Sequence, residues 1–172
     1  EPSETAVVRY LSVGESVDDV GGFAWGDPHL VTLDNIAYDF HAAGEFVLAR
    51  ATGGESYELQ ARFEAISSAI SVTDAVATEV DGTVVAVEAG DEDGVLRIDG
   101  AAVEVTDGDE VVVGAGSVSL DGRLIEIDHG NGDRTFVEAY ATFLNVGARV
   151  APTRAPGTME GLLGDADGNP AN

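Results

Sequence analysis

Apolar and polar residues alternate along much of this chain with the period of two that is typical of β-strands. In the clearest run, 57–65, one face carries Tyr57, Leu59, Ala61, Phe63 and Ala65, and the other carries Glu58, Gln60, Arg62 and Glu64. Such a run predicts a strand with one buried and one solvated face. Further strands are expected at 45–50, 70–80, 83–88, 95–98, 101–105, 110–113, 117–120, 123–129, 134–141 and 143–150.

Turn signals separate these runs every eight to twelve residues. Asp and Gly tolerate the positive φ that tight two-residue hairpin turns require. Asp-Gly pairs stand at Asp81-Gly82, Asp93-Gly94, Asp99-Gly100, Asp107-Gly108 and Asp121-Gly122. Helical periodicity is limited to about one turn around 158–163. The pattern therefore predicts an all-β fold, a sandwich or barrel of antiparallel strands with minimal helix, and argues against an α/β fold with a nucleotide crevice.

The chain divides into two parts by composition. Residues 1–22 are rich in Glu, Ser, Asp and Gly and indicate a leader or linker with one possible strand at 6–13, whereas 23–172 has the size of one domain. No stretch of 18 apolar residues occurs, and Glu1 begins no signal peptide. We expect a soluble piece of a larger protein.

Charge and cysteine content exclude several classes of function. The sequence has 32 Asp and Glu against 8 Arg and no Lys, a formal net charge of −24, so it offers little from which to build a surface for nucleic acid or anionic lipid. Such acidity suits a calcium-rich exterior or a saline medium. The absence of Cys excludes disulfides, a thiolate nucleophile and Cys-based metal sites.

The closing segment carries a candidate cation loop. Asp165, Asp167 and Asn169 are spaced i, i+2, i+4, with which calcium loops place alternate oxygen ligands around a hard ion. The match to an EF-hand is partial, because Gly168 comes at the fourth position and no bidentate Glu follows. Taken alone, the segment also fits a solvated Asp-Gly turn.

A second candidate lies at residues 26–35. Pro28 fixes φ, removes a donor and biases Asp27 toward an extended conformation, so Asp27-Pro28-His29 predicts the rigid start of a strand. Asp34-Asn35 is a turn pair whose carboxylate could remain free for a ligand.

These motifs resemble both ends of a von Willebrand factor type D domain, whose patterns are GDPH, TFDG, YxF and GEYxL at the start and GLCGNFDG at the end. The corresponding segments are Gly26-Asp27-Pro28-His29, Thr32-Leu33-Asp34-Asn35, Tyr38-Asp39-Phe40, Gly44-Glu45-Phe46-Val47-Leu48, and Gly161-Leu162-Leu163-Gly164-Asp165-Ala166-Asp167-Gly168-Asn169. The resemblance implies two packed antiparallel sheets and a calcium site that joins the first turn to the last loop.

Carried over by position, the resemblance implies calcium ligands at Asp34, Asp165 and Asp167, at Asn169 through its backbone carbonyl, and at Asn172. Glu160 and Leu163 stand where the family's closing cysteines would be, so we expect the cation to matter more for stability. The function implied is a non-catalytic structural or adhesive module of a secreted or cell-surface protein. Its partners would be an unidentified protein or matrix and other domains of the same chain. The lack of Asn-x-Ser/Thr sequons fits a bacterial origin.

Two further hypotheses stay open. Some relatives cleave the Asp-Pro bond of GDPH in mild acid. Here the Asp27 carboxyl would attack its own carbonyl carbon, with Pro28 nitrogen as the leaving group and His29 as a proton donor. The second of these hypotheses is that the domain is a passive, salt-tolerant spacer that binds no specific metal. The three histidines, His29, His41 and His129, are too few and too scattered to predict a His-rich metal site, and each is expected at the surface or half-buried.

Overall fold

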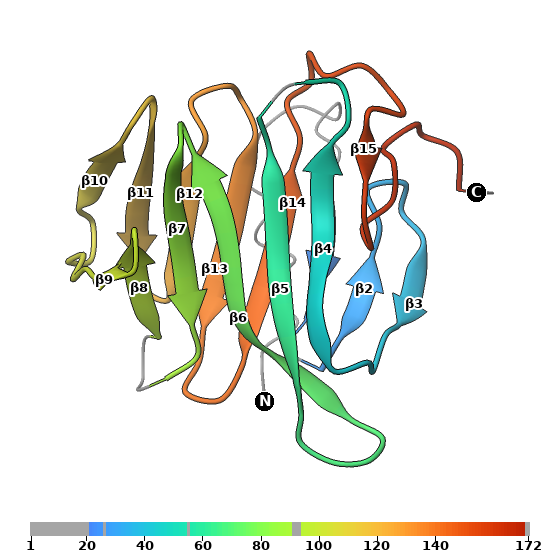
Figure 1. Ribbon diagram of the computed structural model, residues 1–172, viewed down its shortest axis with the longest axis horizontal. Coiled ribbons are helices and arrows are strands. Elements are labelled where there is room, and N and C mark those ends of the chain that lie inside the picture. Colours follow the sequence, from blue (N-terminus) through green and yellow to red (C-terminus); the bar gives the residue numbers. More distant parts are fainter. Residues whose placement is uncertain (1–20, 26, 55, 91–93, 171–172) are drawn as a thin grey trace.

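The computed structural model describes residues 21–25, 27–54, 56–90 and 94–170 (Figure 1), and within these ranges the chain forms strands and no helix. The strands are β1 (Gly21–Ala24), β2 (His29–Val31), β3 (Ala37–Asp39), β4 (Gly44–Ala51), β5 (Glu58–Ala65), β6 (Ser71–Val80), β7 (Thr83–Glu88), β8 (Val95–Ile98), β9 (Ala101–Ala102), β10 (Glu110–Val113), β11 (Gly116–Asp121), β12 (Leu124–Asp128), β13 (Arg134–Ala139), β14 (Leu144–Arg149) and β15 (Met159–Glu160).

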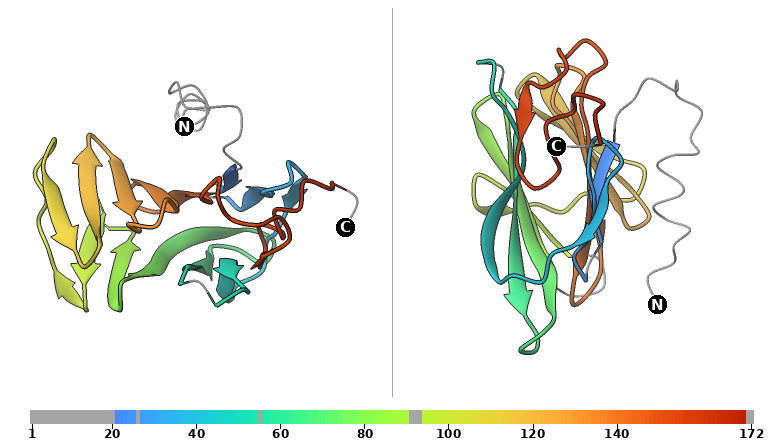
Figure 2. Two further views of the ribbon diagram at one scale, coloured as in Figure 1. Left: turned by 90° about the horizontal axis from the view of Figure 1, so that it is seen from above. Right: turned by 90° about the vertical axis from the view of Figure 1, so that its right-hand side faces the viewer.

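Two antiparallel sheets lie face to face, as the two views of Figure 2 show. The eight-stranded sheet has the order β10-β11-β12-β13-β14-β1-β2-β3, and the seven-stranded sheet has the order β15-β4-β5-β6-β7-β8-β9. Their inner faces supply a core of Val, Leu, Ile, Phe and Ala, which includes the fully buried Phe63, Leu48 and Ile127. The predicted all-β class is confirmed, and of the two architectures left open the molecule adopts the sandwich.

Local sequence explains the central hairpins. Leu59, Ala61 and Phe63 of β5 are buried as the alternation predicts, whereas Ala65, at the end of the strand, is exposed. Two Asp-Gly pairs make the two-residue turns that they predict. Asp81 and Gly82, between β6 and β7, have φ of 50° and 82°. Asp99 and Gly100, between β8 and β9, have φ of 48° and 78°. Positive φ at both positions matches the turn to the twist of the strands.

The helical turn suggested for 158–163 is wrong. Met159 and Glu160 form β15 against β4, and the N–H groups of Leu162 and Leu163 donate to the carbonyls of Val47 and Leu48 at 3.0 and 2.8 Å. Between them Gly161 has φ of 126°, and a Cβ there would lie 2.6 Å from the Leu48 oxygen. Sheet pairing therefore overrides the weak local periodicity.

The beginning and the end of the described chain meet at one side of the sandwich. In Figures 1 and 2 the red closing segment runs beside the blue β2–β3 hairpin. The N–H of Leu33 donates to the carbonyl of Leu163 at 2.7 Å, and the Tyr38 hydroxyl donates to the carbonyl of Leu162. These bonds bring the two predicted motifs into contact. The possible strand at 6–13 lies outside the described residues.

Candidate metal centre

The turn between β2 and β3 presents Asp34 on a braced backbone. The Thr32 hydroxyl accepts from the N–H groups of Asp34 and Ile36 at 3.3 and 3.0 Å, and the Thr32 N–H donates to the Ile36 carbonyl at 2.8 Å. Asn35 has φ of 63°, a conformation that Asn tolerates better than most residues. Asp34 is therefore fixed at the tip of a rigid hairpin.

The closing loop is anchored at Leu163, which is fully buried in the core. After it, Gly164 and Ala166 take φ of 84° and 58°, so the chain bends sharply where the oxygen-bearing residues begin. Asp165 accepts from the Asp167 N–H at 3.3 Å, and Asp167 accepts from the Asn169 N–H at 2.6 Å. The carboxylates of Asp165 and Asp167 thus stabilise the bent loop by accepting hydrogen bonds from its own backbone.

Asp34 joins the two segments directly. One of its carboxylate oxygens accepts from the Ala166 N–H at 3.1 Å, and the other accepts from the Gly168 N–H at 2.7 Å. A Cβ on Gly164 would lie 3.0 Å from Asp34 Oδ2, so the small residue allows the close approach. The carboxylate of Asp34 thus links the first turn of the domain to its last loop.

The result is a cluster of three carboxylates. Ligand oxygens of Asp34, Asp165 and Asp167 all lie within 4.8 Å of one another, with Asp34 and Asp165 half-buried and Asp167 exposed. Two like unit charges 4 Å apart repel by about 1 kcal/mol in water and by more where screening is weaker. A donor set made only of oxygens, with this much negative charge, fits a hard divalent cation such as Ca²⁺.

The remaining predicted ligands are less closely defined. Asn169 lies next to the cluster through its hydrogen bond to Asp167. Asn172 lies outside the described residues. Thr32, Tyr38 and Gly164 belong to the motifs, but no role could be assigned to them from the sequence, because what they do depends on the contact between the first turn and the last loop.

The second predicted motif lies at the other end of the β2–β3 hairpin. Asp27 and His29 are exposed, Pro28 is buried, and the His29 N–H donates to the Asp27 carbonyl at 2.5 Å. The structure also brings His41 next to Asp27, with Nδ1 3.3 Å from Oδ1. The sequence predicted scattered histidines, because only the pairing of β2 with β3 brings His41 close to His29 and Asp27.

His129 differs from its prediction, because it is buried rather than exposed or half-buried. Its ring lies edge-on to Tyr57, with centroids 4.8 Å apart, and its Nε2 lies 3.1 Å from the Thr135 hydroxyl. Burial lowers the pKa of His129. The residue belongs to the interior packing and not to the metal centre.

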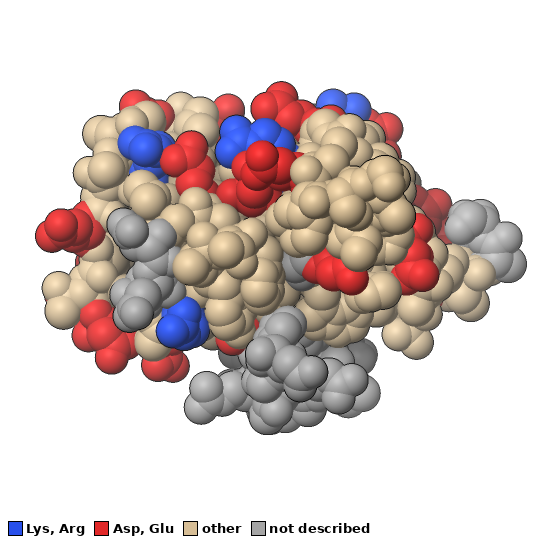
Figure 3. All heavy atoms as spheres, turned by 90° about the horizontal axis from the view of Figure 1, so that it is seen from below, with Lys and Arg blue, Asp and Glu red and all other residues tan. Residues whose placement is uncertain are grey.

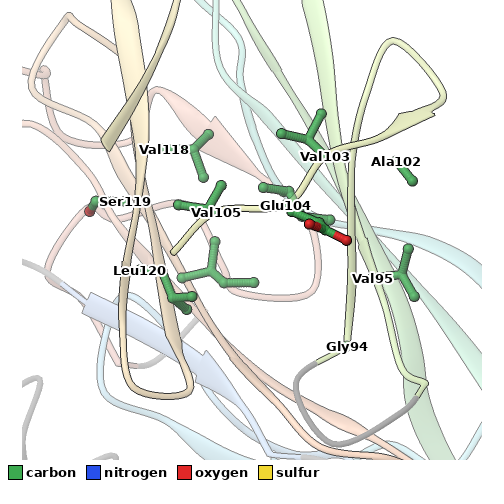
Figure 4. A pocket seen from close by; sticks show the side chains of 11 residues that line it. Gly94, Val95, Ala102, Val103, Glu104, Val105, Val118, Ser119 and Leu120 are labelled. Carbon is green, nitrogen blue, oxygen red and sulfur yellow. The ribbon is translucent and has the colours of Figure 1, made fainter. Parts of the chain in front are cut away.

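A pocket of about 500 Å³ opens between the sheets far along the sandwich from the carboxylates. Figure 4 shows its lining gathered from β8, β9, the segment after β9, and β11, with Val103, Val105, Val118 and Leu120 among the labelled side chains. Of its eleven lining residues, Glu104 is the one with a titratable side chain. Nothing in this lining resembles a catalytic set.

The charged surface agrees with the composition. On the face shown in Figure 3, arginines lie beside acidic side chains, and red acidic groups cover more of the face than blue arginines do. Arg62, Arg97 and Arg134 each pair with a neighbouring carboxylate, at 2.8, 2.9 and 3.1 Å. These arginines are engaged within the protein and do not add up to a basic patch.

A family model of the von Willebrand factor type D domain matches residues 22–172. The chain belongs to the von Willebrand factor type D family. Domains of this family are typically extracellular and generally mediate protein interaction or assembly, which assigns this one a structural or adhesive role in broad terms. The match begins within β1, and the division of the chain into 1–22 and 23–172 stays a prediction.

This type D domain contains no cysteine. At the two positions that resemble the closing cysteines, Leu163 is buried in the core and Glu160 forms an ion pair with Arg50 of β4. Apolar packing and strand pairing therefore hold the closing segment. The part of the chain that the structure describes offers no helical segment of membrane-crossing length and apolarity.

Proposed function

We propose that this domain is a calcium-stabilised, non-catalytic structural or adhesive module of a secreted or cell-surface bacterial protein. The observation that carries the proposal is the convergence of Asp34, from the first hairpin, with Asp165 and Asp167, from the last loop. An ion shared by these three residues would fasten the beginning of the domain to its end. Such a module would bind an unidentified protein or matrix, or other domains of its own chain.

The coordination would combine side chains, backbone and water. Ca²⁺ takes six to eight oxygens, and the three carboxylates supply part of that number. The Asn169 carbonyl and Asn172 are the further ligands that the family resemblance implies, with water completing the set. The ion would also relieve the mutual repulsion of the three carboxylates.

The energy available from such a site is large compared with the stability of a domain. A ligand that binds only the folded state stabilises it by RT ln(1 + [L]/Kd), which is about 4 kcal/mol at a thousandfold excess over Kd. Domains are typically stable by about 5–15 kcal/mol. Calcium would thus decide how firmly this cysteine-free domain holds together outside the cell.

Thermal melting tests the proposal. We expect the melting temperature of the wild type to be higher in excess calcium than in EGTA, and the difference to shrink sharply in Asp167→Asn. The matched control is Asp121→Asn, which removes one exposed carboxylate on β11, in the other part of the eight-stranded sheet. Identical melting of the wild type in calcium and EGTA would leave a passive spacer as the better description.

One observation favours a second function, self-cleavage at Asp27-Pro28. The His29 N–H donates to the scissile carbonyl of Asp27, and the imidazoles of His29 and His41 lie near the Asp27 carboxyl. Attack of that carboxyl on its own carbonyl carbon would form a cyclic anhydride as the carboxyl proton passes to Pro28 nitrogen and the C–N bond breaks. Water would then open the anhydride to restore Asp27.

Intact mass spectrometry after incubation in mild acid tests this second function. Cleavage would give two fragments whose masses sum to the chain plus one water, and Asp27→Asn would suppress them. A single stable mass for the wild type would remove self-cleavage while leaving the calcium proposal unaffected.

A further inference from the structure

Strand β10 ends the eight-stranded sheet, and among the described strands it pairs only with β11. Figure 1 shows β10 at the left-hand end of the sandwich, on the opposite side from β15 and the closing segment. The edge of a sheet presents a row of backbone donors and acceptors with which another chain can pair. The outer edge of β10 is therefore a place where the sheet can be extended.

The pairing with β11 shows which backbone groups face outward. The Asp109 carbonyl, directly before β10, accepts from the Leu120 N–H of β11 at 3.3 Å. Hydrogen-bonded residues recur at every second position of an antiparallel ladder. Val111 is therefore bonded to β11, whereas the N–H and C=O groups of Glu110 and Val112 face away from it.

The side chains of β10 alternate in the same way. Val113 is buried and Val111 packs half-buried against the core, whereas Glu110 and Val112 are exposed. Val112 is 78% exposed, more than any other large apolar side chain in the described part of the chain. An added strand binds through main-chain hydrogen bonds and is selected by side-chain contacts. Glu110 and Val112 offer both.

The other edge strands offer less. Strands β9 and β15 have two residues each, and β3 has three. The closing segment also lies beside β3, where the Tyr38 hydroxyl donates to the Leu162 carbonyl. With four residues, β10 is the longest of the four edge strands.

Acidic residues around β10 decide which kind of chain can pair with it. Glu104, Asp107, Asp109 and Glu110 are all exposed. Like charges directly opposite each other destabilise a strand pair, and opposite charges stabilise it. A second copy of this chain would bring the same acids against them and add its own net charge of −24. The edge therefore favours a basic partner over a second copy.

We propose that the outer edge of β10 binds an extended, basic segment of a partner protein as an added strand. A lysine or arginine of the segment would lie opposite Glu110, and a β-branched residue would lie opposite Val112. These two partner residues would be two positions apart, because alternate residues of a strand share one face. The inference names the class of partner for the interaction role proposed above and rests on that role.

Fluorescence anisotropy of the whole chain with a labelled peptide tests the inference. The peptide repeats Lys-Thr-Val-Thr, which places lysine and valine on one face, and its counterpart has glutamate in place of lysine. In calcium at physiological salt, only the lysine peptide is expected to bind. Val112→Pro removes an outward N–H without changing the charge, and should weaken binding about tenfold or more. Glu110→Lys should weaken it about two- to fivefold.

Ala102→Pro is the matched control. The Val103 N–H donates to the Leu96 carbonyl at 2.9 Å, so by the same alternation the Ala102 N–H faces away from β8. The substitution thus places proline at an outward N–H of another edge strand, and it should bind the lysine peptide like the wild type. Circular dichroism of each variant checks that it is folded.

Several results would overturn the proposal. Equal binding of the lysine peptide by the wild type and Val112→Pro would show attraction by charge alone. Absence of binding, or equal binding of the glutamate peptide, would also reject it. A wild-type dimer in sedimentation that Val112→Pro dissociates would assign the edge to a second copy. None of these results changes the calcium dependence of melting, which tests the proposed function separately.

Discussion

Two charged sites fasten distant parts of this domain, and they differ in how their charge is balanced. In the interior, Asp133 and Arg154 form an ion pair whose side chains are 0% and 4% exposed. At the side of the sandwich, Asp34, Asp165 and Asp167 gather three acids within 4.8 Å in a partly exposed loop. The first site balances acid with base inside the chain, whereas the second accumulates negative charge that an outside cation can neutralise.

The interior site also carries several hydrogen bonds. Asp133 Oδ1 accepts from the Ala151 N–H at 2.8 Å and from Arg154 Nε at 3.3 Å. Next to it, His129 Nδ1 donates to the Glu79 carbonyl at 3.2 Å, which leaves Nε2 to accept from the Thr135 hydroxyl. The comparison teaches that the buried site pairs its acid with a base of the same chain, while the exposed cluster gathers three carboxylates around backbone donors.

The largest effect is expected from breaking the interior pair. Asp133→Ala removes the acidic partner of the Arg154 guanidinium, and loss of one partner of a buried ion pair typically costs about 3–5 kcal/mol. Urea unfolding should show this loss equally with calcium and with EGTA. Asp74→Ala is the matched control, because its pair with the more exposed Arg62 resembles a surface ion pair, worth about 0–1 kcal/mol. Equal losses of stability in the two variants would contradict the predicted difference between the buried and the more exposed ion pair.

The next effect distinguishes the two sites through calcium. At a thousandfold excess over Kd the wild type should gain about 4 kcal/mol, and Asp34→Ala should lose nearly all of that gain. Asp133→Ala should retain it, because the two sites share no residue and distant substitutions are usually additive. The measurement is the urea midpoint over a calcium series, and retention of the full calcium response in Asp34→Ala would count against the cluster.

A smaller effect follows from the buried histidine. Burial lowers the pKa of His129 below its ordinary value of 6.5, so the unfolded chain takes up a proton more readily than the folded one. The free energy of unfolding should fall as the pH drops below about 6.5, by at most ~1.4 kcal/mol per pH unit for one proton. Urea unfolding of His129→Gln across this range should show a free energy of unfolding that depends less on pH than that of the wild type. An equal pH dependence in the two proteins would contradict the assignment to His129.

The smallest effect is expected at the surface pair of Arg50 and Glu160, which joins β4 to β15. Both side chains are about half exposed, at 46% and 50%. An exposed pair gains little because water screens it and the long side chains lose freedom. Arg50→Gln should therefore leave the urea midpoint unchanged within error, with Leu163 still holding the closing segment in the core. A clear loss would show that the ion pair replaces the family's cysteines energetically.

Much of the fold could be predicted because it depends on local patterns. The alternation in 57–65 and the Asp-Gly pairs at 81–82 and 99–100 encode strands and turns within a few residues of each other. β3 and β15 escaped prediction, since they are two or three residues long and are defined by their partners. The helical turn at 158–163 failed for the same reason, because pairing with β4 outweighs local preference.

The candidate sites also differ in whether nearby residues or distant partners define them. Asp34, Asp165 and Asp167 were proposed from motifs at the two chain ends, and the structure brings them together. The contacts of Asp27 and Asp39 with His29 and His41 could not be foreseen, because they require knowing that residue 29 pairs with residue 39. The pair of Asp133 and Arg154 has no motif, since two loop residues meet only after the strands between them are in register.

Calcium titration calorimetry of the metal-free protein tests the central claim most directly. One calcium ion per chain is expected for the wild type, with the binding heat lost in Asp34→Ala and retained in Asp133→Ala. Absence of calcium binding in the wild type, or undiminished binding in Asp34→Ala, would contradict the proposal that an ion joins the first turn to the last loop.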